Sequence, residues 1–296
     1  MNLRAWPAYL LAASFALAQS PPNGGVNLED PAITESSGVV APRLAGGIYW
    51  THNDSGDGPY LYAFDLQGRS HGRWTVPGAQ NVDWEDIAIG PGPRAGRPYL
   101  YVGDIGDNNR TRKEIVVYRI EEPLAGERSA CGGGCRTGPA TAFRLRYPDG
   151  PHNAETLLVH PVSGDLYVIS KASSGDPPTT VYVARARQLR PGAVALQALA
   201  TLDIPDPLFR TFIGGLTGGD ISPDGRHLVL CDYFRMYEAV LPEGARFDEI
   251  WGRRFSWKLI GIGLQVEGIC YRPDGKAVIA TSEGKPCPLF VIPIED

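Results

Sequence analysis

Acidic residues recur along the chain in one spacing. A glutamate stands six residues before a proline, with a short apolar run between them, at Glu85, Glu155 and Glu267. Glu35 fits the same pattern with one additional residue, and Thr217 takes the corresponding place in a further copy. Carboxylates gathered around one axis repel one another unless a cation lies between them, and calcium and magnesium prefer such oxygen ligands. The pattern predicts one divalent cation, Ca²⁺, held by the four glutamates.

Two further roles for the recurring glutamates stay open. A glutamate at the head of each inner strand could accept hydrogen bonds from backbone N–H groups of the neighbouring repeat and lock the repeats together. Recurrence in almost every copy favours that structural role, because a single active site rarely needs one residue repeated by symmetry. The glutamates could also be catalytic acids or bases.

Polar side chains that depart from the repeat are candidates for catalysis. His52 and Asp54 follow the second strand of the first copy, on the rim where we expect the second strands to end, and Lys171 stands where other copies have an acid. These three residues could bind an anionic or polyhydroxylated ligand and act on it. The alternative is that the Asn, Asp and Gly residues around them only form turns.

The elements that must position these residues are short strands. After the proline of each copy comes a turn such as Asp224-Gly225 or Asp274-Gly275, and then a second apolar strand. Asp-Gly between apolar runs indicates a hairpin. Third and fourth strands complete each unit, and repeated four-stranded units predict an all-β fold, a β-propeller. Five starts indicate five blades. Six blades is the alternative, and it would need a hidden repeat in 121–150 or 186–215.

The ends of the repeat array indicate how the ring closes. The last copy has only three strands before the sequence ends at Asp296. Residues 25–34 precede the first copy, and Val26, Leu28 and Ile33 give them apolar contacts at near-alternating positions. We expect this N-terminal segment to be the outer strand of the last blade, because an unpaired edge would otherwise remain.

Composition bounds the class of protein. The chain has 296 residues, with Gly 36, Pro 26 and 43% hydrophobic residues, which excludes a helical bundle. The formal net charge of −5 gives it no electrostatic reason to bind nucleic acid. We expect a single propeller domain over 19–296, monomeric, whose partner is a small molecule, a glycan or a protein.

The first 18 residues have the features of an export signal. Arg4 precedes an apolar run that is too short to span a bilayer, and Ala16-Leu17-Ala18 fits a cleavage site. We expect residues 1–18 to be removed, the mature chain to be secreted or periplasmic, and none of it to be inserted in a membrane.

Export to an oxidising compartment changes how the cysteines are interpreted. Cys131 and Cys135 flank three glycines, which permit the tight turn of a short disulfide. Cys231, Cys270 and Cys287 are left over, so we expect at least one of them to be free unless chains are cross-linked.

Several motifs together resemble a family of secreted bacterial β-propeller proteins of unassigned function, over nearly the whole mature chain. They are Glu35-Ser-Ser-Gly, Trp50-Thr-His-Asn-Asp-Ser-Gly56, Asp83-Trp-Glu-Asp-Ile-Ala88, Gly103-Asp-Ile-Gly-Asp-Asn108, Asn153-Ala-Glu155, Gly219-Asp-Ile-Ser-Pro-Asp-Gly225 and Glu267-Gly. More distantly, the chain is similar to propellers of the phytase-like esterase and gluconolactonase type, through the strand headed by glutamate.

The distant resemblance implies a metal-dependent hydrolase. Such propellers often hold calcium at the channel mouth and hydrolyse phosphoesters or lactones, which would make the four glutamates metal ligands and His52 a general base. The competing interpretation is a non-catalytic extracytoplasmic propeller that binds a protein or a glycan on its rim.

Overall fold

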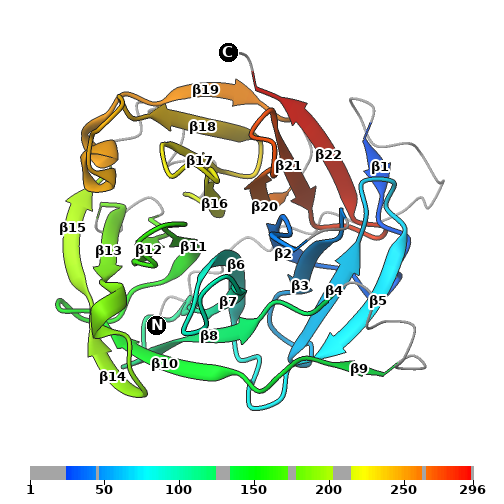
Figure 1. Ribbon diagram of the computed structural model, residues 1–296, viewed down its shortest axis with the longest axis horizontal. Helices are drawn as coiled ribbons and strands as arrows, with labels where there is room; N and C mark the ends of the chain where they lie inside the picture. Colours follow the sequence, from blue (N-terminus) through cyan, green and yellow to red (C-terminus); the bar gives the residue numbers. More distant parts are fainter. Residues whose placement is uncertain are drawn as a thin grey trace, which may run out of the picture.

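Five antiparallel sheets surround a central axis like the blades of a propeller (Figure 1). The computed structural model describes residues 25–44, 47–124, 134–172, 178–202, 215–261 and 265–294. The prediction of a five-bladed, all-β propeller is confirmed, and the six-bladed alternative is wrong. The described parts of 121–150 and 186–215 hold no sixth sheet, because their strands join the five blades already counted.

Each blade is a meander whose strands follow the chain from the axis outward. Blade 1 contains β2 (Ser36–Val40), β3 (Tyr49–Asn53), β4 (Tyr60–Phe64) and β5 (Ser70–Thr75). Blade 2 contains β6 (Trp84–Pro91), β7 (Pro98–Asp104), β8 (Ile115–Glu121) and β10 (Thr141–Arg146). Blade 3 contains β11 (Ala154–Val159), β12 (Leu166–Ser170), β13 (Thr180–Ala184) and β15 (Gln197–Thr201).

The remaining blades follow the same order. Blade 4 contains β16 (Gly218–Ile221), β17 (His227–Cys231), β18 (Arg235–Val240) and β19 (Ser256–Leu259). Blade 5 contains β20 (Val266–Tyr271), β21 (Ala277–Ser282), β22 (Pro288–Pro293) and, outermost, β1 (Val26–Asn27). Two short strands, β9 (Cys135–Arg136) and β14 (Gly192–Ala195), add to blades 1 and 2 in parallel. Two 3₁₀ helices are η3 (Ala186–Gln188) and η5 (Phe247–Gly252).

The N-terminal segment closes the ring as predicted. Val26 pairs with Leu289 and Asn27 pairs with Pro288, antiparallel. The N–H of Leu28 continues the contact by donating to the carbonyl of Cys287 at 2.9 Å. Only two of residues 25–34 are strand, and the following Leu28 and Ile33 are buried apolar anchors, each 2% exposed.

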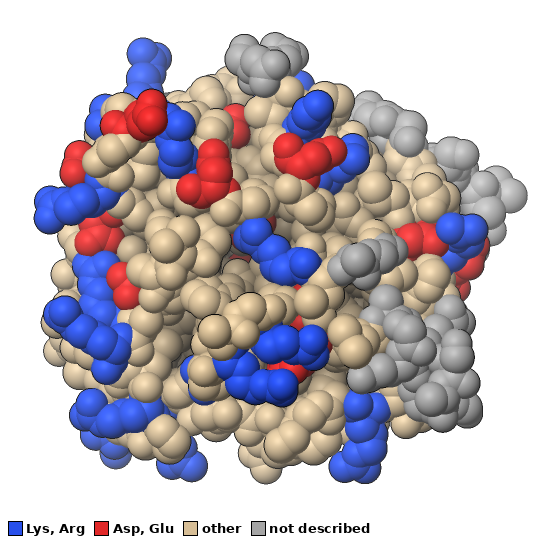
Figure 2. Space-filling model, in the orientation of Figure 1, with Lys and Arg blue, Asp and Glu red and all other residues tan. Residues whose placement is uncertain are grey.

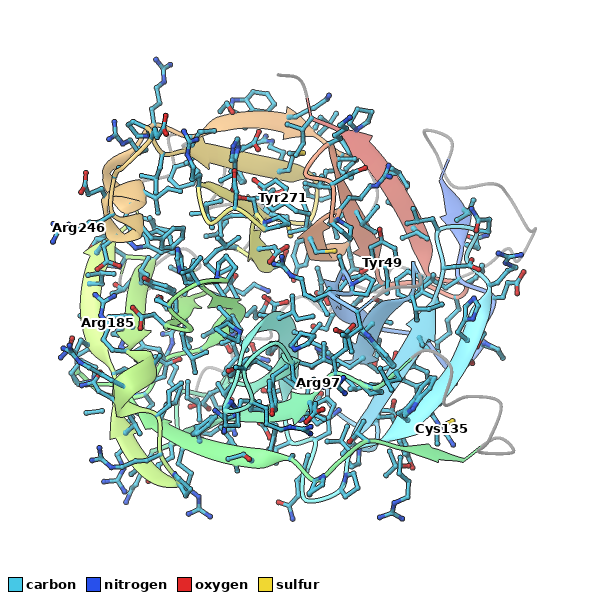
Figure 3. All side chains as sticks on the ribbon, viewed as in Figure 1. Tyr49, Arg97, Cys135, Arg185, Arg246 and Tyr271 are labelled. Atoms are coloured by element: carbon cyan, nitrogen blue, oxygen red, sulfur yellow. The ribbon has the colours of Figure 1, made fainter. Side chains whose placement is uncertain are left out.

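Apolar side chains fill the space between neighbouring blades (Figure 3). Trp50 and Trp74 of blade 1 pack with Ile87 of blade 2, for example, and Tyr49 of blade 1 packs with Ile279 of blade 5. The inner strands β2, β11, β16 and β20 are buried along their whole length, because each lies between two other blades. The core is therefore divided into five clusters, one at each junction between blades.

Charged side chains stand mainly on the outside of this core. Figure 2 shows Lys and Arg side chains around the rim of the viewed face and beside its central hollow, with Asp and Glu side chains among them. No helix of the described residues has the length and apolar character needed to cross a membrane.

Two predictions fall wholly or partly outside the described residues. The export signal, residues 1–18, lies there, and so does Cys131, so the disulfide between Cys131 and Cys135 stays a prediction. The other three cysteines, Cys231, Cys270 and Cys287, are free and buried, which agrees with the expectation of at least one free thiol.

Candidate metal centre

A β-bulge places the recurring glutamates. The pairing of the inner strand with the second strand shifts register at Glu85 in β6, at Glu155 in β11 and at Glu267 in β20. A bulged residue is unpaired in the ladder, which frees it to point in a different direction from its neighbours. The three glutamates are thus equivalent positions in blades 2, 3 and 5, and each is buried, between 5% and 8% exposed.

The first blade departs from the pattern. Its bulge falls at Ser37, between Ser36 and Gly38 of β2, so Glu35 is not the equivalent of the other glutamates. Glu35 lies just before β2 and is exposed. The sequence register was wrong here, because the additional residue before the proline hid the correct alignment.

Hydroxyl groups replace the carboxylate at two of the five positions. Ser37 donates to the backbone carbonyl of Glu85 at 2.7 Å, and Thr217 donates to that of Val266 at 2.8 Å. Each bond joins one blade to the next. Among the described residues, by contrast, none of the three bulged glutamates accepts a hydrogen bond on its carboxylate from a backbone N–H. The inter-blade locking role expected of the glutamates belongs to these two hydroxyls and to the carboxylates of Asp86 and Asp220, which accept the N–H groups of Leu157 and Tyr271 in the next blade, both at 2.9 Å.

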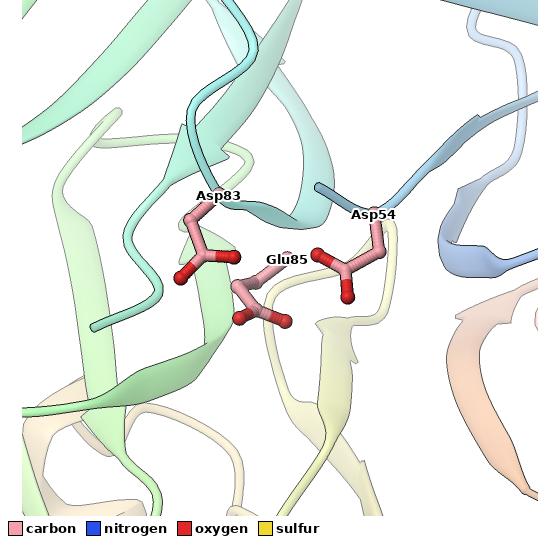
Figure 4. A group of neighbouring side chains, drawn as sticks. All are labelled: Asp54, Asp83 and Glu85. Carbon is pink, nitrogen blue, oxygen red and sulfur yellow. The ribbon is translucent and has the colours of Figure 1, made fainter. Parts of the chain in front are cut away.

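Three carboxylates meet beside the second blade (Figure 4). Asp54 follows β3, Asp83 precedes β6, and Glu85 lies within β6. One oxygen from each lies within 4.8 Å of the others, and this is the only such group that could hold a metal in the described part of the chain. Calcium binds oxygens at about 2.3–2.6 Å, so ligands on opposite sides of one ion stand roughly 5 Å apart. The cluster is thus compact enough for one calcium ion.

Glu85 is the unusual member of this cluster. Glu85 is buried, with 5% of its surface exposed. Among the described residues, no donor or cation forms a hydrogen bond or ion pair with its carboxylate. Burial, and then the charges of Glu155 and Asp54, raise its pKa well above the ordinary value. A buried, unpartnered carboxylate facing two others fits a cation as its missing partner.

The loop that carries Asp83 is held by a buried framework. The carboxylate of Asp104, 1% exposed, accepts the N–H groups of Val82 and Asp83, both at 3.3 Å. Arg112 forms an ion pair with Asp104 at 2.7 Å, and Asn81 donates to the carbonyl of Asp54 at 2.9 Å. Asp54 and Asp83 are therefore held near each other by contacts outside the cluster.

The pKa values of the two aspartates follow from this environment. Burial, and then the charge of Asp54, raise the pKa of Asp83 to about 6. Burial also raises the pKa of Asp54, although the N–H of Ser55 lowers it in part. The raised pKa values show that the carboxylates of the cluster disfavour one another's charge, a repulsion that a cation would relieve.

The other two bulged glutamates have protein partners. Glu155 forms an ion pair with Lys171, whose Nζ also donates to the hydroxyl of Tyr233 at 3.0 Å and lies 4.9 Å from the centre of its ring. Burial opposes the charge on Lys171, but Glu155 and Tyr233 outweigh burial and raise its pKa. Lys171 therefore stays charged. The sequence did not indicate Tyr233, because its partner comes from another blade.

Glu267 is influenced by the charge of Glu283, which follows β21. Burial, and then the charge of Glu283, raise the pKa of Glu267 to about 9. Glu267 therefore favours its protonated form at neutral pH. The acidic side chains near the cluster thus include a carboxylic acid that favours its neutral form.

His52 lies inside the protein, not on the rim as the sequence suggested. It is 0% exposed, its ring stands edge-on to Trp84 at 5.6 Å, and its Nδ1 lies 3.0 Å from the carbonyl of Asn53. Nε2 has no hydrogen-bond partner among the described residues. Burial lowers the pKa of His52 to about 4, so the ring is neutral. Its role as a general base stays a prediction.

The structure therefore brings together a different set of residues from the predicted one. Asp54, a predicted catalytic residue, and Glu85, a predicted ligand, meet Asp83, which was not a candidate. Glu155, Glu267 and Lys171 lie close enough to influence the same charges, and Glu35 lies outside the compact group. Asp83 could have been suspected, because it stands two residues before Glu85 in the same short motif, Asp83-Trp-Glu-Asp-Ile-Ala88.

Comparisons with known proteins give no indication of activity. No family model matches the chain, and no curated protein matches it. Among solved structures, it is similar to hydrazine synthase of Kuenenia stuttgartiensis, with a TM-score of 0.44, 13% identity, and coverage of 88% of this chain and 71% of that one. We draw nothing about activity from a likeness at that level. The class that the fold defines is a five-bladed β-propeller, and the part of the chain that the structure describes contains one compact acidic group that could hold a metal ion.

Proposed function

We propose that this propeller binds one divalent cation, calcium, through Asp54, Asp83 and Glu85, and with it hydrolyses a phosphoester, carboxylic ester or lactone bond in a small molecule. The observation that carries the proposal is the Glu85 carboxylate, which is buried, has no protein partner among the described residues, and faces two further carboxylates. Three oxygen ligands leave roughly half of a calcium coordination shell of about six to eight oxygens for water and substrate.

The residues around the cluster suit a hydrolytic role. A bound calcium ion would polarise the carbonyl or phosphoryl oxygen of the substrate. Lys171 places a second positive charge at the mouth, where it would attract an anionic group. Glu267, protonated at neutral pH, would supply a proton to the leaving oxygen.

Calorimetric titration of chelator-treated protein with calcium tests the metal site. Calcium at a hundredfold excess over Kd should stabilise the fold by about 2.7 kcal/mol, because it binds only the folded state. Glu85→Gln and Asp83→Asn should abolish the heat of binding and the stabilisation. Glu243→Gln, which changes an exposed glutamate away from the cluster, should leave both unchanged. No heat of binding with calcium or magnesium would refute the site.

Turnover tests the hydrolase separately. Calcium-loaded protein should release product from p-nitrophenyl phosphate, p-nitrophenyl acetate or gluconolactone, and a chelator should stop the release. Tight calcium binding without turnover on any ester class would reject the enzyme. It would favour instead a propeller that binds a protein or glycan on its rim, with the metal as a structural or ligand-binding element.

We also propose that residues 1–18 direct export and that the mature, monomeric chain is secreted or periplasmic. The support is the short apolar run and the Ala16-Leu17-Ala18 site. N-terminal sequencing of protein from its natural host should begin at or near Gln19, and a retained Met1 would contradict the proposal.

A further inference from the structure

The outer strands of the first two blades are covered in one consistent way. Strand β9 lies between β8 and β10 of blade 2 in the sequence, yet it pairs with β5 of blade 1, Trp74 opposite Cys135. Strand β14 lies between β13 and β15 of blade 3 in the sequence, yet it pairs with β10 of blade 2, Phe143 opposite Gly192. In both cases the connection between the third and fourth strands of one blade covers the blade before it, in parallel.

The same connection covers two further blades by other means. In blade 4 it contains η5, whose Phe247 and Trp251 rings pack on Tyr167 of blade 3 at 5.3 and 5.6 Å. In blade 1 it is a tight turn, and the carbonyl of Gly68 accepts the N–H of Glu29, just after β1 of blade 5, at 2.8 Å. In four of the five blades, this connection therefore contacts the blade before it.

Blade 4 has no cover of this kind among the described residues, and the ring closure explains why. Its cover would be the connection between the third and fourth strands of blade 5, but those strands are β22 and β1, which lie far apart in the sequence. At this place the structure has a groove of about 370 Å³, lined by Met236, Glu238, Ser256, Trp257, Lys258, Pro293 and Ile294. Within the described residues, no strand pairs with the free edge of β19.

The uncovered strand exposes apolar side chains. All four residues of β19 are exposed, and Trp257 and Leu259, which alternate onto one face, are 60% and 48% exposed. The guanidinium of Arg235 lies 5.2 Å from the centre of the Trp257 ring. An exposed edge with a large aromatic is a template for another strand unless something blocks it.

The charges near β19 indicate what would fit. Arg253 and Arg254 stand just before the strand and are exposed, and neither forms an ion pair with any residue that the structure describes. Lys258 lies within the strand and contacts the carbonyl of Pro293 at 3.5 Å. The stretch 253–258 thus carries three cations and no acid.

We propose that β19 is a docking edge for an extended, acidic peptide segment of a partner protein, which adds to blade 4 as its fifth strand. The backbone of the segment would pair with β19 as β9 and β14 pair with β5 and β10. Its apolar side chains would cover Trp257 and Leu259, and its acidic side chains would meet Arg253 and Arg254. The docking is independent of the metal centre.

Fluorescence anisotropy of a labelled heptapeptide tests this proposal. In the peptide, valine alternates with glutamate. It should bind the full chain, and Trp257→Ala should weaken binding about tenfold, the scale of a buried aromatic anchor. The double variant Arg253→Glu, Arg254→Glu should weaken it at least as much. Val162→Ala, at an exposed valine between β11 and β12, is the matched control and should bind normally.

Control peptides and a mass measurement complete the test. A peptide with lysine in place of glutamate, or with a central proline, should fail to bind, because the first reverses the charge and the second removes a backbone donor. Equal binding of the lysine peptide, or unchanged affinity of Trp257→Ala, would overturn the proposal. A dimer at micromolar concentration that Trp257→Ala dissociates would also overturn it, because a second copy would then be the occupant. Tight peptide binding that appears only when residues 19–24 are deleted would overturn it as well, because that segment of the chain would then be the occupant.

Discussion

Gly106 lies directly against the carboxylate of Glu85. A β-carbon at Gly106 would stand 2.2 Å from Oε1 of Glu85 and 2.4 Å from Oδ2 of Asp83, far inside van der Waals contact. The backbone of the segment after β7 therefore forms one wall of the acidic cluster, and that wall has no room for a side chain.

Gly106→Ala should disrupt the metal site without changing its charge. The methyl group must displace the Glu85 and Asp83 carboxylates, so the calcium affinity should fall by at least tenfold. Calorimetric titration measures this loss. Gly134→Ala is the control, because a β-carbon there meets no atom within 4 Å. Equal calcium affinity in the Gly106 variant and the wild type would show that the carboxylates are not the ligands.

The metal-free protein should lose stability as pH rises. Folding raises the pKa of Asp83 from 3.8 to about 6 and that of Glu267 from 4.5 to about 9, so the folded state binds more protons than the unfolded chain between those values. This contribution is complete below about pH 4 and is lost as pH rises through 6 and then 9. Thermal melts in chelator between pH 5 and 9 should show a falling Tm.

Two additions identify the groups responsible for that pH dependence. Glu267→Gln should flatten the fall of Tm between pH 7 and 9, because the amide does not ionise. Saturating calcium should oppose the fall around pH 6, because the cation binds the ionised form of the Asp83 cluster. A Tm that rises with pH in chelator would contradict the assigned direction of both pKa shifts.

Lys171 and Glu155 should depend on each other for their effect on stability. Their side chains are 12% and 9% exposed, so Lys171→Met leaves a buried carboxylate unpaired. Breaking such a pair from one side costs about 3–5 kcal/mol. The double variant Lys171→Met, Glu155→Gln should recover much of this loss, as measured by urea unfolding. Additive losses in the double variant would show that the ion pair carries no coupling energy.

Leu28→Ala should weaken the closure of the ring. Leu28 is 2% exposed and belongs to the apolar cluster between blades 5 and 1. Removing a buried leucine side chain costs about 2–5 kcal/mol. Val291→Ala, at an exposed position on β22, should cost less than about 0.5 kcal/mol. A Leu28 variant as stable as the wild type would mean that residues after β1 do not anchor the last blade.

The fold was predictable because its signals are local and repeated. Three features recur in the same order along the chain: the glutamate before an apolar strand, the Asp-Gly turn and the third strand. Their recurrence is enough to predict repeated blades. The apolar residues Val26, Leu28 and Ile33 also indicated the closing segment. The alignment of Glu35 with the other glutamates was wrong. A bulge, which depends on pairing with β3, decides which residue is unpaired in the ladder, and here that residue is Ser37.

The site was predictable only in part because it is formed between blades. Glu85 follows from the repeat, but its meeting with Asp54 and Asp83 depends on how a loop after β3 approaches one before β6. His52 shows the same limit: its position in the sequence suggested the rim, whereas packing on Trp84 encloses it. Distances between side chains on different blades are not encoded in spacing along the chain.

The pairing of β1 with β22 has a consequence for the order in which the chain can fold. The thiol of Cys287 donates to the carbonyl of Ile33, 254 residues away in the sequence. A growing chain makes β1 first and its partner last, so the first strand must wait, unpaired, while the other blades assemble. Contacts of such long sequence separation form slowly. The ring is thus completed only after the last blade has formed, and until then the edge of β22 and the apolar side chains of Leu28 and Ile33 are open to other chains.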